Sequence, residues 1–103
     1  MAGTLYITEY AAMSVFVGAN GQAGQMPAEP PIAEQTIGTG AQSAAFNANT
    51  KFVRLHAQTN GMSVAFGTNP TATTSEHRLA QNQTEYVAIP QGQSYKVAAV
   101  DNV

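Results

Sequence analysis

The feature that most constrains the fold of this chain is a series of short segments, late in the sequence, in which apolar and polar residues alternate. Such alternation is typical of strands with one buried face, because successive side chains of a strand point to opposite sides. Compact turn signals join the segments in two pairs, and each pair predicts a β-hairpin. The pairs are 51–58 with 62–66, joined by Thr59-Asn60-Gly61, and 85–89 with 94–100, joined by Pro90-Gln91-Gly92.

Similar segments occur earlier in the chain. They are 4–10, 12–17, 32–38 and 42–46, with a further short strand or helical turn expected around 77–80. The alanines near residue 44 also permit the start of a helix. The total is about seven or eight short strands in a chain long enough for one domain, 1–103. This pattern predicts an all-β fold, an antiparallel β-sandwich or small barrel, and favours the jelly roll, the eight-stranded form of the sandwich.

The faces of two predicted strands can be assigned. In 51–58, Val53 and Leu55 mark one face as the core, so the alternate residues point outward. In 4–10, Leu5 and Ile7 alternate with Tyr6, Thr8 and Tyr10 in the same way. We expect the outward side chains to include a protein interface. The residues predicted for that interface are Phe52, Arg54, His56, Tyr6 and Tyr10.

Between these regions, residues 18–31 contain three glycines and three prolines. A backbone that is alternately very free and very constrained suits no regular element, so the segment predicts a flexible arm. Long loops in compact domains are usually functional or mobile. In an assembly such an arm can become ordered by packing on a neighbour.

The composition excludes several classes of function. Charged residues make up 10% of the chain, against about 25% in ordinary soluble domains, and the net charge is −2. The four basic residues are scattered, which argues against nucleic-acid binding. No apolar run is long enough to span a membrane and no signal peptide is apparent, so we expect a soluble chain without a membrane partner. A low-charge surface also suits a protein packed in an assembly.

Catalytic and metal-binding patterns are weak. The chain has no cysteine and no His-x-His pair, and His56 with Glu76-His77 offers too few ligands for a cupin-like metal site. A Ser-His-Asp triad would need Asp101, near the end of the chain, and no paired glutamates lie in a recognisable sugar-binding pattern. We therefore expect no enzyme activity, no cofactor and no metal.

One resemblance gives a sharper expectation. The segments PPIAEQ, SAAFNANTKFVRLHA, SVAFGTNPTATTS, LAQNQTEYVAI and GQSYKVAAV, between Pro30 and Val100, resemble small β-sandwich or jelly-roll head decoration (cement) proteins of tailed bacteriophages. The resemblance implies a structural virion protein on the capsid exterior. Its partners would be the major capsid protein and copies of itself, as a dimer or trimer. The alternatives are a tail or fibre-associated β-module, or a cupin-like sugar- or metal-binding domain.

Overall fold

The computed structural model describes residues 2–103, apart from the side chain of Phe16. Every regular element is a strand and every strand pairing is antiparallel, so the predicted all-β, antiparallel fold is confirmed. The described residues form ten strands rather than the seven or eight predicted. They are β1 (Thr4–Tyr10), β2 (Met13–Val17), β3 (Ala23–Pro27), β4 (Ala33–Gly38), β5 (Ala41–Gln42), β6 (Phe52–Gln58), β7 (Met62–Gly67), β8 (His77–Leu79), β9 (Thr84–Ala88) and β10 (Lys96–Asp101).

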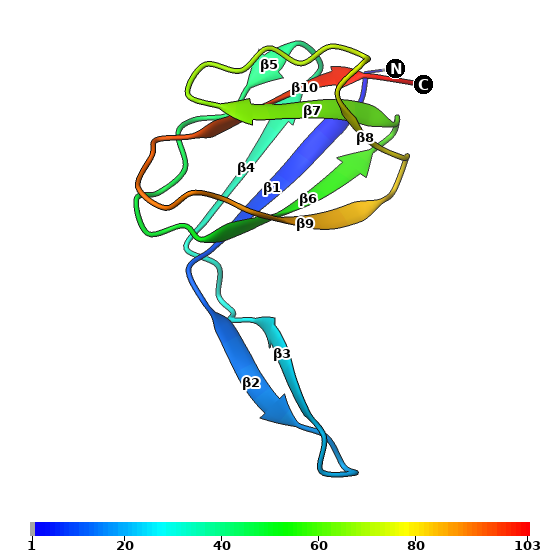
Figure 1. Ribbon diagram of the computed structural model, residues 1–103. Helices are drawn as coiled ribbons and strands as arrows, with labels where there is room; N and C mark the ends of the chain where they lie inside the picture. Colours follow the sequence, from blue (N-terminus) through cyan, green and yellow to red (C-terminus); the bar gives the residue numbers. More distant parts are fainter. Residues whose placement is uncertain (1) are drawn as a thin grey trace.

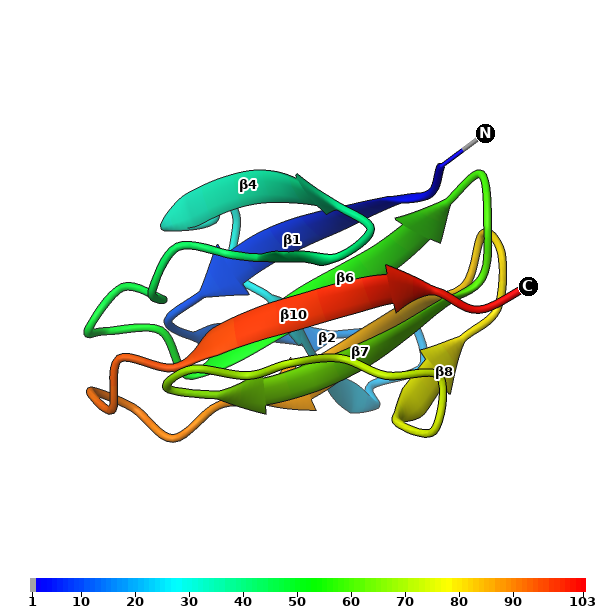
Figure 2. The same cartoon turned by 90° about the horizontal axis from the view of Figure 1, so that it is seen from above.

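Eight strands form the body, a sandwich of two sheets, and the other two form an arm (Figure 1). The first sheet has the order β4-β1-β6-β9 and the second the order β5-β10-β7-β8. Seen from above, the two layers lie one against the other (Figure 2). The inward residues of both sheets form one core. Its fully enclosed members include Leu5, Ile7, Val53, Leu55, Met62, Val64, Leu79 and Val97.

The strand order is that of a jelly roll with one rearrangement. Strands β4 to β10 have the neighbours that jelly-roll strands have, and β1 lies between β4 and β6. In the usual jelly roll that central place belongs to the last strand of the chain. Here the first strand occupies it, and the two ends of the chain meet at one end of the sandwich (Figure 1). The backbone N–H of Gly3 donates a hydrogen bond to Asp101 Oδ1 at 3.1 Å.

The two predicted hairpins are wrong as pairings. β6 pairs with β1 and β9 in the first sheet, whereas β7 pairs with β10 and β8 in the second. Likewise β9 and β10 lie in different sheets. Each compact turn therefore passes the chain from one sheet to the other, so that consecutive strands lie in opposite layers of the sandwich. A strand with one apolar face satisfies either arrangement, which is why alternation alone does not distinguish them.

Gly61 shows how tightly the first of these turns fits. A Cβ at this position would lie 3.0 Å from the Asn102 carbonyl oxygen and 3.1 Å from that of Leu79. The backbone N–H of Asn102 also donates a hydrogen bond to the Gly61 carbonyl at 2.8 Å. The glycine therefore allows the close approach of β8 and the C-terminal segment at this end of the sandwich.

The Gly/Pro-rich segment is also different from the prediction. Residues 18–31 are not an irregular flexible arm throughout, because β3 pairs with β2 as a two-stranded hairpin with the turn at 18–22. Gly21 supplies the positive φ of 83° that this turn requires. The segment 12–17, predicted as a strand, is a strand, but it belongs to the arm and not to the body. Residues 42–46 form neither a full strand nor a helix, since β5 covers only Ala41–Gln42.

Candidate interaction surface

The outer faces of the two sheets are exposed to different extents. The loop 68–76 lies over the second sheet (Figure 2). Gln42 Nε2 donates hydrogen bonds to Asn69 Oδ1 at 2.9 Å and to the Pro70 carbonyl at 2.6 Å, which hold this loop in place. Ala98 points outward from β10 and is nevertheless buried beside the loop. The outer face of the second sheet is thus largely covered by a loop of the same chain.

The outer face of the first sheet, by contrast, is open, and it carries all five residues predicted for an interface. They come from the neighbouring strands β1 and β6, where Tyr6 is opposite His56 and Tyr10 is opposite Phe52. Arg54 lies opposite Thr8 on one side and Tyr86 of β9 on the other. Alternation in each strand therefore placed these side chains on one face, and the pairing of the strands brings them together.

One of the five is not exposed. Tyr10 retains only 4% of its accessible surface, because its ring stacks on Phe52 with centroids 5.1 Å apart and planes 12° apart. Its hydroxyl donates a hydrogen bond of 2.6 Å to Glu29 Oε2, in the segment that returns from the arm. Burial, together with this carboxylate, raises the pKa of Tyr10 to about 12. Tyr10 is therefore an anchor between the arm and the body, and the more accessible member of the pair is Phe52, which is half-buried.

Of the other polar members of the face, His56 has a local partner and Tyr6 is exposed. His56 Nδ1 lies 2.7 Å from Thr84 Oγ1 of β9, and the His56 ring is half-buried. Tyr6 remains 46% exposed at the end of β1 away from the arm. The exposed Tyr6, together with the half-buried Phe52 and Arg54, makes a surface for protein contact rather than a site that encloses a substrate.

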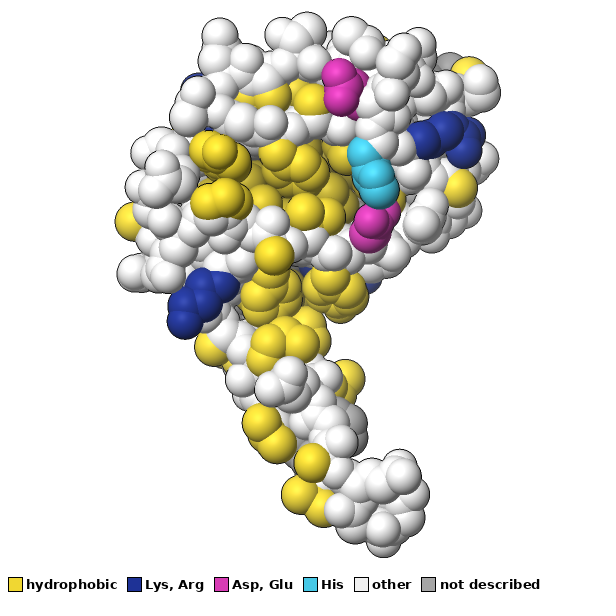
Figure 3. All heavy atoms as spheres, viewed as in Figure 1, with side chains coloured by type: hydrophobic (Ala, Val, Ile, Leu, Met, Phe, Trp, Pro, Cys, Tyr) yellow, Lys and Arg dark blue, Asp and Glu magenta, His cyan; other side chains and the backbone are white. Residues whose placement is uncertain are grey.

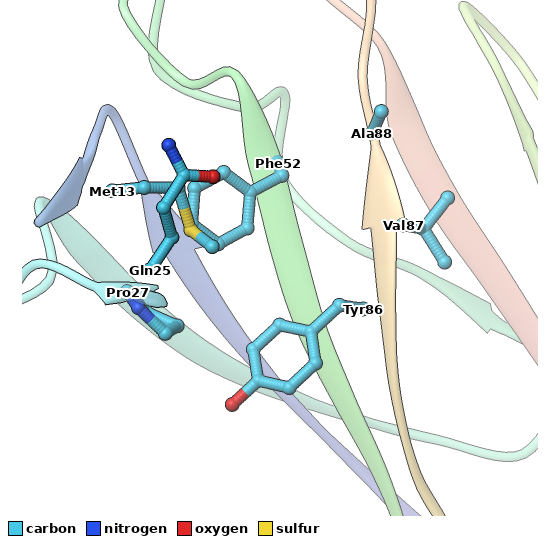
Figure 4. A pocket seen from close by; sticks show the side chains of 7 residues that line it. All are labelled: Met13, Gln25, Pro27, Phe52, Tyr86, Val87 and Ala88. Carbon is cyan, nitrogen blue, oxygen red and sulfur yellow. The ribbon is translucent and has the colours of Figure 1, made fainter. Parts of the chain in front are cut away.

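Where the arm joins the body, this face is hollowed into a groove. The groove has a volume of about 460 Å³ and is lined almost entirely by apolar side chains (Figure 4). The rings of Phe52 and Tyr86, with centroids 6.3 Å apart, form its aromatic part. Its lining residues are Met13, Gln25, Pro27, Phe52, Tyr86, Val87 and Ala88.

The arm carries the apolar surface beyond the groove. Alternate residues of β2, namely Met13, Val15 and Val17, are 45%, 67% and 69% exposed. We call these three residues the arm stripe. Of the eight large apolar side chains that are exposed among the described residues, four belong to the arm. Figure 3 shows the apolar patches along it, and no charged residue occurs between Glu9 and Glu29.

Sequence reasoning missed the groove and the arm stripe. The stripe alternates visibly in MSVFV, but the glycines and prolines that follow suggested that nothing regular would pair with it. Tyr86 and Ala88 were missed because their position beside Phe52 depends on the pairing of β9 with β6, which are separated by two other strands in the sequence.

Two carboxylates of the described chain illustrate structural roles. Glu9 is buried, and its carboxylate accepts hydrogen bonds of 2.8 Å from the Asn47 backbone N–H and from Thr50 Oγ1. It thereby fastens the start of β6 to β1. His77 Nε2 and Glu85 Oε2 lie 2.8 Å apart, where β8 and β9 form the edges of the two sheets. Within residues 2–103, no three His, Asp or Glu side chains are grouped as a metal would require.

No helix in the described part of the chain has the length and hydropathy to cross a membrane. Comparison with protein-family models, with curated proteins and with solved structures finds no match to this chain. The features that bear on its function are therefore the groove, the arm stripe and the open face of the first sheet.

Proposed function

We propose that this chain is a structural protein that binds the outer surface of a tailed-phage capsid and stabilises the shell. The observation that carries the proposal is the arm stripe, a row of apolar side chains that the fold of one chain leaves uncovered. Exposed apolar rows of this kind mark contact surfaces, since water contact with them is unfavourable. A protein that functions in an assembly removes that surface from water.

The choice of a capsid rests on the resemblance of residues 30–100 to head decoration proteins, and the geometry is compatible with it in two respects. The outer face of the first sheet is not covered by any described loop of the body, as a contact with a shell requires. The arm also extends the molecule to 44 Å along its longest axis, against 21 Å along its shortest. A projecting hairpin can reach a neighbouring copy of the chain on the shell, while the open face of the first sheet stays available to the capsid.

Binding of this kind would stabilise the shell by mass action. A ligand that binds one state of a lattice and not another shifts the equilibrium towards the bound state by RT ln(1 + [L]/Kd). At a free concentration about 100 times the Kd, this amounts to about 2.7 kcal/mol for each site. Many copies on one shell would add such contributions, so no catalytic residue is needed.

The direct test is co-sedimentation of the purified chain with mature capsids that lack decoration. We expect saturable binding at micromolar concentration and a higher temperature of capsid disruption. Arg54→Ala, on the open face, should weaken binding about tenfold or more, whereas Arg78→Ala, on the second sheet, should bind as the wild type does. Failure of the wild-type chain to sediment with capsids, with no change in their heat resistance, would refute the proposal. Binding to purified tails instead would assign the chain to a tail or fibre-associated role.

A further inference from the structure

The arm is an unusual element to leave in water. β2 pairs only with β3, and the two strands join neither sheet of the body. Two-stranded hairpins are marginally stable on their own, and they need a further layer on an apolar face. Here the arm stripe is that apolar face, and beyond Met13 nothing in the described part of the chain covers it.

The groove and the arm stripe form one continuous surface. Met13 belongs to both, because it starts the stripe and lines the groove. Val15 and Val17 continue the stripe away from the groove without lining it. The polar lining side chains are Gln25 and Tyr86, and no lining residue is charged. A partner must therefore offer a row of apolar side chains with the same spacing as the stripe, and charge contributes nothing to its selection.

We propose that the partner is a second copy of this chain, whose arm stripe covers this one. In a two-fold arrangement each contact occurs twice, so two stripes can lie antiparallel with Val15 facing Val15 at the axis. Val17 of each copy then meets Met13 of the other. Met13 and Val17 are four residues apart, about 13 Å along a strand. The tip of each stripe thus enters the groove of the opposite copy, beside Phe52 and Tyr86.

Other occupants fit less well. A small apolar molecule in the groove would leave Val15 and Val17 exposed, because neither residue lines it. A different protein would need an uncharged, extended apolar row of matching period. The chain itself provides such a row in every copy, at the same concentration as the groove.

The size of the contact sets the expected affinity. A ribbon of two five-residue strands is about 16 Å long and about 10 Å wide. Even with the groove added, each copy offers less than the roughly 800 Å² per partner of a standard interface. We therefore expect a weak, transient dimer with a dissociation constant on the order of 100 µM. The inference does not depend on capsid binding, because it concerns the purified chain alone.

Sedimentation velocity over about 1–500 µM tests the proposal with three proteins. The wild type should shift from one chain of 10.8 kDa to twice that mass as concentration rises. Val15→Asp places a charge at the two-fold axis and should raise the dissociation constant at least about 30-fold. Val103→Asp is the matched control, because it makes the same substitution at an 89% exposed valine at the other end of the molecule (Figure 1). It should dimerise like the wild type.

A cross-link gives a second measure. The chain has no cysteine, so Val15→Cys introduces one thiol per copy, and the arrangement places the two thiols together at the axis. Mild oxidation should give a disulfide-linked dimer at least about ten times faster than it does for Val103→Cys. Thermal unfolding of each variant should match the wild type under reducing conditions, which shows that the body is folded.

Several results would overturn the inference. These are a wild-type chain that stays monomeric up to 500 µM, a dimer that Val15→Asp leaves intact, equal loss of dimer in Val103→Asp, or a closed trimer. A strong fall in dimerisation between about 50 mM and 500 mM salt would also contradict a contact without charges. If the chain is monomeric but still sediments with capsids, this inference alone is refuted. If the chain dimerises but does not bind capsids, only the proposed function is refuted.

Discussion

Leu55 and Arg54 are neighbours in β6, yet their environments are opposite. Leu55 is fully enclosed in the core between the sheets, whereas Arg54 lies half-buried on the open face. The difference follows from the two-residue period of a strand, which sends adjacent side chains to opposite sides of the sheet. At the scale of single residues, the alternation in the sequence was therefore enough to separate core from surface here.

The same pair provides a stability prediction. Leu55→Ala should lower the free energy of unfolding by about 2–5 kcal/mol, because it removes buried methyl groups and leaves a cavity. Arg54→Ala should change it by less than about 1 kcal/mol, since the guanidinium is in contact with solvent. Urea unfolding followed by tyrosine fluorescence measures both. A larger loss for Arg54→Ala than for Leu55→Ala would mean that the two faces are assigned the wrong way round.

Tyr10 departs from simple alternation, because an outward position became buried beneath the base of the arm. Its raised pKa, about 12, has a consequence at alkaline pH. The folded state holds the proton more strongly than the unfolded state, whose tyrosines titrate near 10. The resulting stability is fully present below pH 10 and is lost as pH rises from about 10 to about 12.

We expect this loss to be about 1–2 kcal/mol, because the contact with Glu29 is partly screened by solvent, and to be missing from Tyr10→Phe, which has nothing to ionise at that position. Comparing urea unfolding of the two proteins between pH 9 and 12 isolates the contribution of Tyr10 from that of other groups. Absorbance at 295 nm provides an independent readout, in which the tyrosinate signal that Tyr10→Phe removes should develop at about pH 12. A Tyr10 signal that develops near pH 10 would contradict the buried position of Tyr10.

At the scale of elements, the arm is separate from the core. No described side chain between residues 11 and 36 is buried, although this segment makes up about a quarter of the chain. The arm also gives the molecule a radius of gyration of 14.5 Å, against about 13 Å for a compact domain of 100 residues. Its contacts with the body are limited to its base, where Tyr10 binds Glu29 and Met13 and Pro27 line the groove.

Replacing residues 13–27 by a short Gly-Ser link should therefore leave the body folded. We expect the free energy of unfolding to fall by no more than about 1 kcal/mol, because the core loses no enclosed residue. Chemical denaturation of the shortened chain measures this, and the same protein should fail to dimerise. Loss of cooperative unfolding would show instead that the hairpin is part of the folding unit.

At the scale of the whole molecule, the outer faces of the two sheets differ in how much surface they expose to solvent. The second sheet is covered by the loop 68–76, and the chain ends meet at one end of the body. The first sheet and the arm stay open and form a continuous surface on the other side. This division explains how a small chain can keep a complete core and still present a large area for contact.

The sequence by itself determined the class of fold and which side of each strand points to the core. Both depend on a local property, the two-residue period of side-chain direction, which can be read wherever apolar and polar residues alternate. The burial of Leu5, Ile7, Val53 and Leu55 agrees with that reading. The five residues predicted for an interface share one face for the same reason, although burial removed Tyr10 from its exposed part.

Only the tertiary structure decided which strands are neighbours. β6 and β7 have the same alternation whether they pair as a hairpin or face each other across the core, so the choice depends on long-range packing of both sheets. The groove likewise requires β9 to lie beside β6 and the arm to leave the body next to Phe52. The arm hairpin was not predicted because its glycines and prolines favour turns. Their local preferences give no sign of the strands on either side of the turn.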